Sequence, residues 1–313
     1  MNPLSSIYGT VAKLRNAVYD RAWRRANRLT GPVVSVGNLS AGGAGKTPFV
    51  LLLGGMLRDR GVKFDVLSRG YGRRSRGVHL VEAGGPAATF GDEPLLIARR
   101  LQVPVVVGED RFTAGLFAES KFGPQLHLLD DGFQHRSLAR DFDIVMLGPG
   151  DAQESLLPVG RLREPLVALC RANAVVIENG LSPPAEAAGK SVWRIARGIA
   201  LPPLPARLVA FCGVARPERF VEQLRSRGMD VAATRFFRDH HAYTQADVHA
   251  LLALKVRSGA EAFITTEKDE INLGPFGAAI APLAVARVTM ELADADRCLD
   301  AMLKAVSKRA GSS

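Results

Sequence analysis

A glycine-rich loop between two apolar runs is the feature that most constrains how this chain folds. Residues 40–47 are Ser-Ala-Gly-Gly-Ala-Gly-Lys-Thr. The short β-branched run at residues 33–36 predicts a buried strand before the loop, and the apolar run at residues 49–57 predicts a helix after it. A strand, a glycine-rich loop and a helix in this order form the context of a phosphate-binding P-loop.

The residue types in this loop suit a nucleoside triphosphate. Glycines let backbone N–H groups surround a phosphate, and the helix N-terminus adds partial positive charge. The Lys46 ammonium can reach the β- and γ-phosphates, and the Thr47 hydroxyl can ligate Mg²⁺. The strict pattern has glycine where this chain has Ser40, so an ordinary glycine-rich turn is the alternative. The predicted phosphate ligands are Ser40, Ala41, Gly42, Gly43, Ala44, Gly45, Lys46 and Thr47.

Composition limits the class of protein and of partner. With 313 residues, 47% of them hydrophobic, the chain can form one large or two medium domains with a substantial core. A net charge of +10 favours an anionic partner, which is nucleic acid, anionic lipid or a phosphorylated substrate. The three cysteines lack metal-ligand spacing. No apolar run reaches the about 18 residues of a membrane span, and no secretory signal is present, so we expect a cytoplasmic protein.

Strand and helix signals alternate from Pro32 to about Gly180, which predicts an α/β fold. The fold class expected is a P-loop NTPase-like domain with a mostly parallel sheet, at residues 31–182, plus a smaller α/β C-terminal domain. Its predicted helices follow Lys46, Asp92, Arg111 and Pro165. Its predicted strands are residues 33–36, 64–67, 103–107, 126–129, 144–147 and 174–177.

Proline-rich residues 183–206 are expected to link the two domains through a pair of strands at 192–195 and 199–201. Residues 207–313 then predict the smaller α/β domain, which would close over the nucleotide as a lid. Its polar tail from residue 304 is expected to fray.

The first 30 residues predict a basic amphipathic helix. Ile7, Val11, Leu14 and Val18 recur at helical spacing, among six Lys or Arg residues and one acid. Such a helix either lies on an anionic membrane surface or packs on its own domain with a solvated basic face.

Two adjacent carboxylates, Asp130 and Asp131, end the strand predicted at 126–129. They resemble a Walker-B acid, which lies near the Mg²⁺ of a P-loop, although a solvated turn is the alternative. Asp92 begins a predicted helix and either caps it or accepts a proton from an attacking hydroxyl. His240 precedes a helix of the second domain, where helix capping competes with a polar site facing the cleft.

Together these segments resemble the tetraacyldisaccharide 4′-kinase family, the lipid A 4′-kinases of Gram-negative bacteria. The matching residues, in order along most of the chain, are 35–48, 67–72, 91–94 (Gly-Asp-Glu-Pro), 129–135 (Leu-Asp-Asp-Gly-Phe-Gln-His), 160–165, 239–240 and 265–269 (Thr-Thr-Glu-Lys-Asp). The family also has Ser or Thr at the position of Ser40.

The resemblance implies transfer of the ATP γ-phosphoryl group to the 4′-hydroxyl of a tetraacylated glucosamine disaccharide 1-phosphate. It implies peripheral attachment to the cytoplasmic face of the bacterial inner membrane through the N-terminal helix. It suggests Asp92 as catalytic base, assisted by His240, with Lys46 stabilising the transferring group. It further suggests Mg²⁺ near Thr47, Asp130, Asp131 and Glu164, and substrate roles for Tyr71, Arg111 and Gln134.

Two rival functions remain at this point. A partitioning-type nucleotide-switch ATPase carries an extra Lys ahead of the paired glycines, where this chain has Ser40-Ala41. A basic nucleic-acid-binding NTPase would suit the charge of +10, but aromatic content is only 6% and no reading motif is present, so no nucleic-acid partner is expected.

Overall fold

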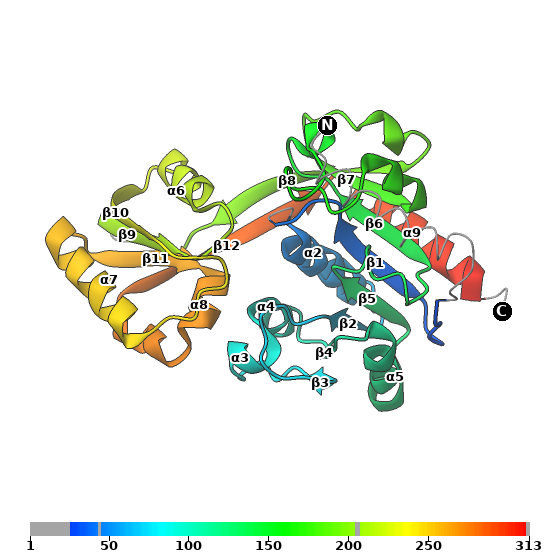
Figure 1. The fold of residues 1–313 in the computed structure, drawn as a ribbon, viewed down its shortest axis with the longest axis horizontal. Helices are drawn as coiled ribbons and strands as arrows, with labels where there is room; N and C mark the ends of the chain where they lie inside the picture. The colour runs from blue at the N-terminus through cyan, green and yellow to red at the C-terminus, as the bar shows by residue number, and fades with distance from the viewer. Residues whose placement is uncertain (1–25, 43–44, 204–206, 311–313) are drawn as a thin grey trace.

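The computed structural model describes residues 26–42, 45–203 and 207–310. Its strands fall into two groups joined by two long strands (Figure 1). The first group, which we call the first lobe, contains β1 (Val33–Asn38), β2 (Phe64–Ser68), β3 (His79–Leu80), β4 (Val105–Val107), β5 (Leu126–Asp130), β6 (Phe142–Met146) and β7 (Ala174–Glu178). The second lobe contains β9 (Arg207–Cys212), β10 (Asp230–Phe236) and β11 (Ala262–Thr266). The long strands are β8 (Ser191–Ala200) and β12 (Leu283–Leu292).

All these strands belong to one twelve-stranded sheet with the order β10-β9-β11-β12-β8-β7-β6-β1-β5-β2-β4-β3. Neighbours are parallel except for two pairs, β3 with β4 and β12 with β8. The predicted α/β class with a mostly parallel sheet is therefore confirmed.

The central strands of the first lobe are buried along their whole length, as parallel strands covered on both faces must be. On one face, Val34 and Val36 pack with Phe49 and Leu53 of helix α2 (Lys46–Asp59). On the other face, Val33 shares a cluster with Ala114 of helix α5 (Arg111–Phe122). These two layers fix where each strand ends, and so fix the polar residues that follow the strands.

Helices of both lobes meet across the molecule. Besides α2 and α5, the first lobe has α3 (Ala87–Phe90) and α4 (Asp92–Leu101). The second lobe has α6 (Pro217–Ser226), α7 (Gln245–Ser258) and α8 (Glu267–Leu273). Helix α8 lies against α4, and its Ile271 joins the apolar cluster of the first lobe. No helix in the described ranges is both long and apolar enough to cross a bilayer.

Two expectations about elements were wrong, and in a third the type of helix differs. The pair of linker strands is a single strand, β8, whose first half pairs with β7 and whose second half pairs with β12. The helix expected after Pro165 is a 3₁₀ helix, Leu166–Arg171. The tail expected to fray from residue 304 belongs to helix α9 (Ala295–Ala310), which the sequence reasoning missed together with β12.

Helix α9 also departs from the expected unit at residues 207–313. Leu299, Met302 and Val306 of α9 are buried in the same cluster as Val34 and Phe49 of the first lobe. The chain thus returns to the first lobe, because the apolar stripe of α9 finds its partner surface there. The basic helix expected at residues 1–30 lies almost entirely outside the described residues.

Candidate active site

The predicted P-loop lies between the buried end of β1 and the start of α2. Gly42 and Gly45 both have positive φ, 76° and 82°, which favours glycine at these two positions. A Cβ at Gly45 would lie 2.8 Å from Arg197 Nη1 of β8 and from Met290 Cε of β12. Gly45 of the loop therefore packs closely against side chains of both long strands. Gly43 and Ala44 lie outside the described residues.

A polar network fixes the end of β1 and the first residue of α2. Lys46 Nζ donates to Asn38 Oδ1 at 3.2 Å and lies 3.6 Å from Asp131 Oδ1. Arg163 donates to both oxygens of Asp131, at 3.1 and 3.2 Å, and to Asn38 Oδ1. Burial would raise the pKa of Asp131, but Lys46 and Arg163 hold it below its usual value. The network thus keeps Asp131 ionised beside the phosphate loop.

Ser40, the departure from the strict P-loop pattern, has a structural partner. Its hydroxyl donates to Asp151 Oδ2 at 3.0 Å, and Asp151 is 1% exposed. The same carboxylate oxygen accepts the Gly148 N–H at 2.8 Å. Ser40 therefore ties the start of the loop to the segment after β6. Asp151 was missed by the sequence reasoning, because nothing in the sequence places residue 151 beside residue 40.

Asp130 has a different environment from its neighbour Asp131. It is 2% exposed, and Ser68 Oγ donates to its Oδ2 at 3.1 Å. Its Oδ1 has no hydrogen-bond partner among the described residues. Burial raises the pKa of Asp130 to about 7, helped by the negative charges of Glu93 and Asp131 and opposed by Lys46. An unpartnered oxygen of a buried carboxylate costs free energy, so Asp130 Oδ1 is a candidate to bind a cation.

The remaining predicted residues of this region lie around the same network. Glu164 is fully buried, and its Oε2 accepts Arg171 Nη2 at 2.9 Å. Gln134 Nε2 donates to the Asn38 carbonyl at 2.9 Å. Arg111 donates to the carbonyls of residues 108 and 109, and burial lowers its pKa to about 10 although Asp130 opposes that shift. Thr47 is buried at the start of α2.

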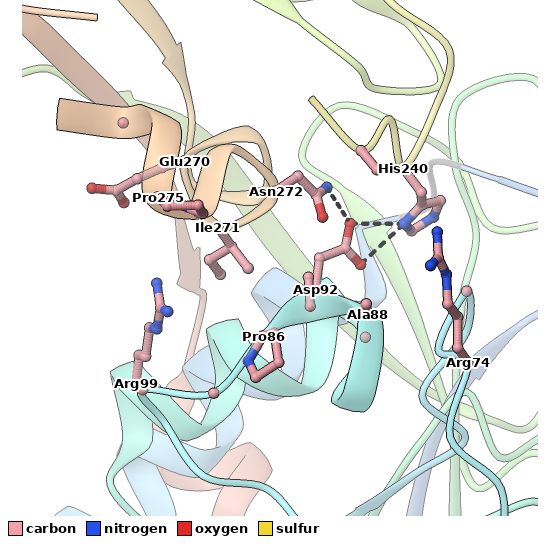
Figure 2. Close-up of a pocket in the computed structure, with 18 of the residues that line it drawn as sticks. Arg74, Pro86, Ala88, Asp92, Arg99, His240, Glu270, Ile271, Asn272 and Pro275 are labelled. Carbon is pink, nitrogen blue, oxygen red and sulfur yellow. Dashed lines mark hydrogen bonds and ion pairs between the residues drawn. The ribbon is translucent and has the colours of Figure 1, made fainter. Parts of the chain in front are cut away.

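Asp92 and His240, which lie 148 residues apart in the chain, are in contact. His240 Nδ1 lies 2.8 Å from Asp92 Oδ2 and 3.0 Å from Oδ1. Figure 2 shows that His240 and Asn272 reach the Asp92 carboxylate from two segments of the second lobe. Asp92 is 3% exposed and is the first residue of α4, where its Oδ1 accepts the Glu93 N–H at 2.8 Å. Asp92 therefore holds a backbone N–H at the start of α4 and also contacts His240.

The charges of this pair support each other. Burial would raise the pKa of Asp92, but the hydrogen bond with His240 and the charge of Lys268 lower it below its usual value. The hydrogen bond to Asp92 raises the pKa of His240, although burial opposes that shift. The carboxylate is thus ionised at neutral pH and held between groups of the second lobe.

A cavity of about 1060 Å³ opens beside this pair (Figure 2). Its lining includes Asp92, His240, Asn272 and the exposed ring of Tyr71, whose centroid lies 5.2 Å from that of His240. Arg74, Arg99 and Arg238 also line it. The cavity is lined by residues of both lobes and has room for a ligand of many atoms.

Among the described residues, no three His, Cys, Asp or Glu side chains are grouped to hold a metal ion by themselves. Magnesium does not require such a cage, because it commonly binds through one or two protein ligands and the phosphates of a nucleotide. The unpartnered Oδ1 of Asp130 fits that pattern.

Comparisons with known proteins agree with this geometry. The family model for LpxK, tetraacyldisaccharide-1-P 4′-kinase, matches residues 1–307. A tetraacyldisaccharide 4′-kinase of Koribacter versatilis is 51% identical over 99% of this chain and 100% of its own length. One from Geobacter metallireducens is 38% identical over 93% of each chain. The crystal structure of LpxK from Aquifex aeolicus in complex with ATP has a TM-score of 0.81 and 32% identity, covering 97% of this chain and 98% of that one.

These matches run through both lobes and include the segments that carry the phosphate loop and the Asp92–His240 pair. They favour neither the partitioning-type ATPase nor the nucleic-acid-binding NTPase. The site is thus one of an ATP-dependent phosphotransferase, and the chain belongs to the tetraacyldisaccharide 4′-kinase family.

Proposed function

We propose that Asp92 is the base that accepts the proton of the 4′-hydroxyl when this chain phosphorylates a tetraacylated glucosamine disaccharide 1-phosphate. The observation that carries the proposal is the contact of 2.8 Å between Asp92 and His240 across the two lobes. A kinase base of this kind accepts the hydroxyl proton while the phosphoryl group moves, and it must be ionised to do so. The lowered pKa of Asp92 satisfies that requirement.

His240 would orient Asp92 and keep its charge compensated. Its Nδ1 faces both carboxylate oxygens, which leaves the imidazole Nε2 directed away from them. Tyr71 lies against the His240 ring and lines the cavity, which supports a role for Tyr71 in positioning the sugar head group. Arg111 and Gln134 lie nearer the phosphate loop, where Gln134 holds the Asn38 carbonyl.

Residues 40–47 would hold the ATP phosphates, and Lys46 would supply the positive charge beside the phosphoryl group that is transferred. Lys46 is shared between Asn38 and Asp131, so it is already placed at the loop and is only 15% exposed. Its charge would stabilise the negative charge that develops on the transferring phosphoryl group. The second lobe would exclude water from this step when it is docked on the first.

The residues present fit a magnesium ion. Asp130 and Thr47 would hold it, because Asp130 has a buried oxygen without a partner while Asp131 is already paired with Arg163 and Lys46. Glu164 already forms an ion pair with Arg171, so any effect of Glu164 on the ion would be shared with that arginine. Magnesium, when bound, neutralises charge on the β- and γ-phosphate oxygens.

A transfer assay tests the proposal directly. The purified chain is incubated with ATP labelled in the γ-phosphate and with the lipid disaccharide 1-phosphate, and the labelled lipid is separated and counted. We expect label in the lipid with the wild type and a large loss with Asp92→Ala. Full activity of a folded Asp92→Ala variant would rule out the assigned base.

Peripheral attachment to the cytoplasmic face of the inner membrane is part of the same proposal. Its support is the excess of Lys and Arg in the first 30 residues, each able to contribute up to about 1 kcal/mol near anionic lipid. Deleting residues 1–28 should weaken binding to anionic vesicles in a sedimentation assay while ATP binding persists. Binding by the full chain should fall as salt rises. Equal binding to neutral vesicles at high salt would instead indicate a hydrophobic anchor.

A further inference from the structure

Asp92 has two contacts besides His240, one from helix α8 and one from its own helix α4. Asn272 Nδ2 donates to Asp92 Oδ2 at 2.9 Å, and the Glu93 N–H donates to Oδ1 at 2.8 Å. With His240 facing both oxygens, each carboxylate oxygen has two donors within hydrogen-bonding distance. The orientation of Asp92 is therefore set jointly by α4, the His240 segment and α8.

The next residue of α4 is held by the same helix. Lys268 Nζ donates to Glu93 Oε1 at 2.9 Å, and the two side chains are 22% and 28% exposed. Lys268 also acts on Asp92 by charge, and its effect on the pKa of Asp92 is second only to that of the His240 hydrogen bond among the influences that lower it. Burial would lower the pKa of Lys268, but Glu93 and Asp92 hold it above its usual value. Lys268 thus brings a permanent positive charge to the start of α4.

A third contact fastens the far end of α4. Arg100 Nη1 lies 2.5 Å from Glu267 Oε1, at the opposite end of the helix from Asp92. Helices α4 and α8 are therefore joined by three polar pairs, Asp92–Asn272, Glu93–Lys268 and Arg100–Glu267, around the buried Ile271. Two of these pairs act on the carboxylate, and one only fastens the helices.

We propose that Lys268 and Asn272 are positioning residues, which keep the Asp92 carboxylate ionised and oriented only while helix α8 is docked on α4. The proposal rests on the function of Asp92 proposed above. Helix α8 then does more than line the cavity. If the second lobe moved away from the first, His240, Lys268 and Asn272 would all leave Asp92 together. Docking of the two lobes would therefore also set the ionisation and the orientation of Asp92.

The sign of the effect follows from the charges around Asp92. His240 and Lys268 are the cations that lower its pKa, and Glu93 lies between Asp92 and Lys268. Asp239 lies 3.8 Å from His240 Nε2, and the other charged groups lining the cavity are Arg74, Arg99, Arg238 and Glu270. Removing the charge of Lys268 leaves burial, which raises the pKa of Asp92, less opposed. Since only the ionised carboxylate accepts a proton, the acid limb of the kcat profile should move to higher pH.

The test compares two ends of the same helix pair. Lys268→Met removes the charge beside Asp92, whereas the matched control Arg100→Met removes the pair that has no contact with Asp92. kcat and KM for ATP and for the lipid are measured across the pH range in which both variants stay folded, together with their melting temperatures. We expect Lys268→Met to move the acid limb to higher pH, so that kcat falls by about 10-fold or more on the acid side of the profile, with KM for ATP unchanged. Arg100→Met should lower the melting temperature without moving the limb.

A second pair of variants keeps the test decisive if Lys268→Met does not fold. Asn272→Asp is nearly isosteric and places a like charge beside Asp92, so it should move the acid limb further than Asn272→Leu does. Lys268→Arg should retain the wild-type limb. Acid limbs that stay unchanged in Lys268→Met and Asn272→Asp would overturn the proposal and leave α8 with a purely structural role. Retained activity in Asp92→Ala would instead overturn the assignment of the base, so the two failures are distinguishable.

Discussion

Asp92 and Asp130 are both almost fully buried, but their surroundings shift the carboxylate pKa in opposite directions. Asp92 receives donors from His240 and Asn272 and feels the charge of Lys268, so its pKa lies below the usual value. Burial raises the pKa of Asp130 to about 7, because Ser68 is its one hydrogen-bond partner among the described residues and Glu93 and Asp131 add negative charge. The first region is completed by protein groups. The second region has a carboxylate oxygen, Asp130 Oδ1, without a hydrogen-bond partner among the described residues.

The comparison teaches that burial alone does not decide the state of a carboxylate. The region around Asp92 spans both lobes, so its partners depend on how the lobes are docked. The region around Asp130 lies in the first lobe at the end of β5, so it persists whether or not the second lobe is docked. Substitutions in the two regions should therefore have different effects.

The largest effect is expected from Lys46→Ala, which disables the region around Asp130. The transition state loses a positive charge at the phosphoryl group, and loss of one such group commonly costs about 10²–10³ in kcat. We expect transfer to fall by at least that much, with the fold retained because Arg163 still pairs with Asp131. The transfer assay and a thermal melt measure both. Near-normal turnover of the folded variant would exclude the phosphate role of residues 40–47.

Asp92→Ala is expected to lower kcat by about 10²–10⁴ with little change in KM for ATP, because a lost base affects chemistry rather than nucleotide binding. His240→Ala should lower kcat less, since the carboxylate remains. Steady-state kinetics with each substrate varied in turn distinguishes the two. A variant whose only defect is a lower melting temperature would return Asp92 to a structural role.

Asp130→Asn sharpens the contrast with its neighbour. The change removes a carboxyl group whose charged form is disfavoured by burial, so the melting temperature without magnesium should stay equal or rise at neutral pH. The magnesium concentration needed for half-maximal activity should rise by about 10-fold or more, the scale on which supporting contacts of a metal site act. Asp131→Asn should instead destabilise the protein, because Lys46 and Arg163 lose their partner. If the two variants behaved equally in melts and magnesium titrations, Asp130 and Asp131 would not have the separate roles assigned to them.

The smallest effect concerns stability and pH. His240 has a raised pKa, so its contribution is complete below the unfolded value of about 6.5 and is lost as pH rises through the folded pKa. Asp92 has a lowered pKa, so its contribution is present above about 3.9 and is lost as pH falls through the folded pKa. His240→Gln should therefore lower the melting temperature by a few degrees, about 2–4 °C, near pH 5.5, and by less near pH 8.5. A constant difference at both values would mean that charge does not hold the pair.

The sequence predicted the strands of both lobes well, because fully buried parallel strands appear as continuous apolar runs. It placed Asp130, Asp131 and Lys46 together through strand ends and the loop motif, and it brought Asp92 and His240 together only through the family resemblance. Asn272 and Asp151 were not predictable, since each acts on a residue more than 100 positions away through side-chain geometry. Asn38 and Arg163 were marked in the sequence only as polar residues at or near strand ends, which does not show that both contact Asp131 or Lys46.

Strand β12 and helix α9 were missed for a related reason. The apolar residues Leu299, Met302 and Val306 have helical spacing, but spacing does not reveal which surface a helix covers. The alternation in β12 is likewise visible in the sequence, where Met290 and Leu292 are buried and Glu291 is exposed. Only the folded chain shows that this segment crosses back between the lobes.

That return has a topological consequence. Between the end of β8 and the start of β12, the chain forms an insertion whose two ends meet, because these strands run antiparallel and are hydrogen-bonded to each other. Residues on both sides of the insertion build one apolar cluster around α2. A shortened chain that stops after β8 would therefore be an incomplete nucleotide-binding domain, whereas replacing the insertion by a short turn keeps every buried residue of that cluster except Ile271. The second lobe could therefore be exchanged for another at this one junction without interrupting the chain of the first lobe.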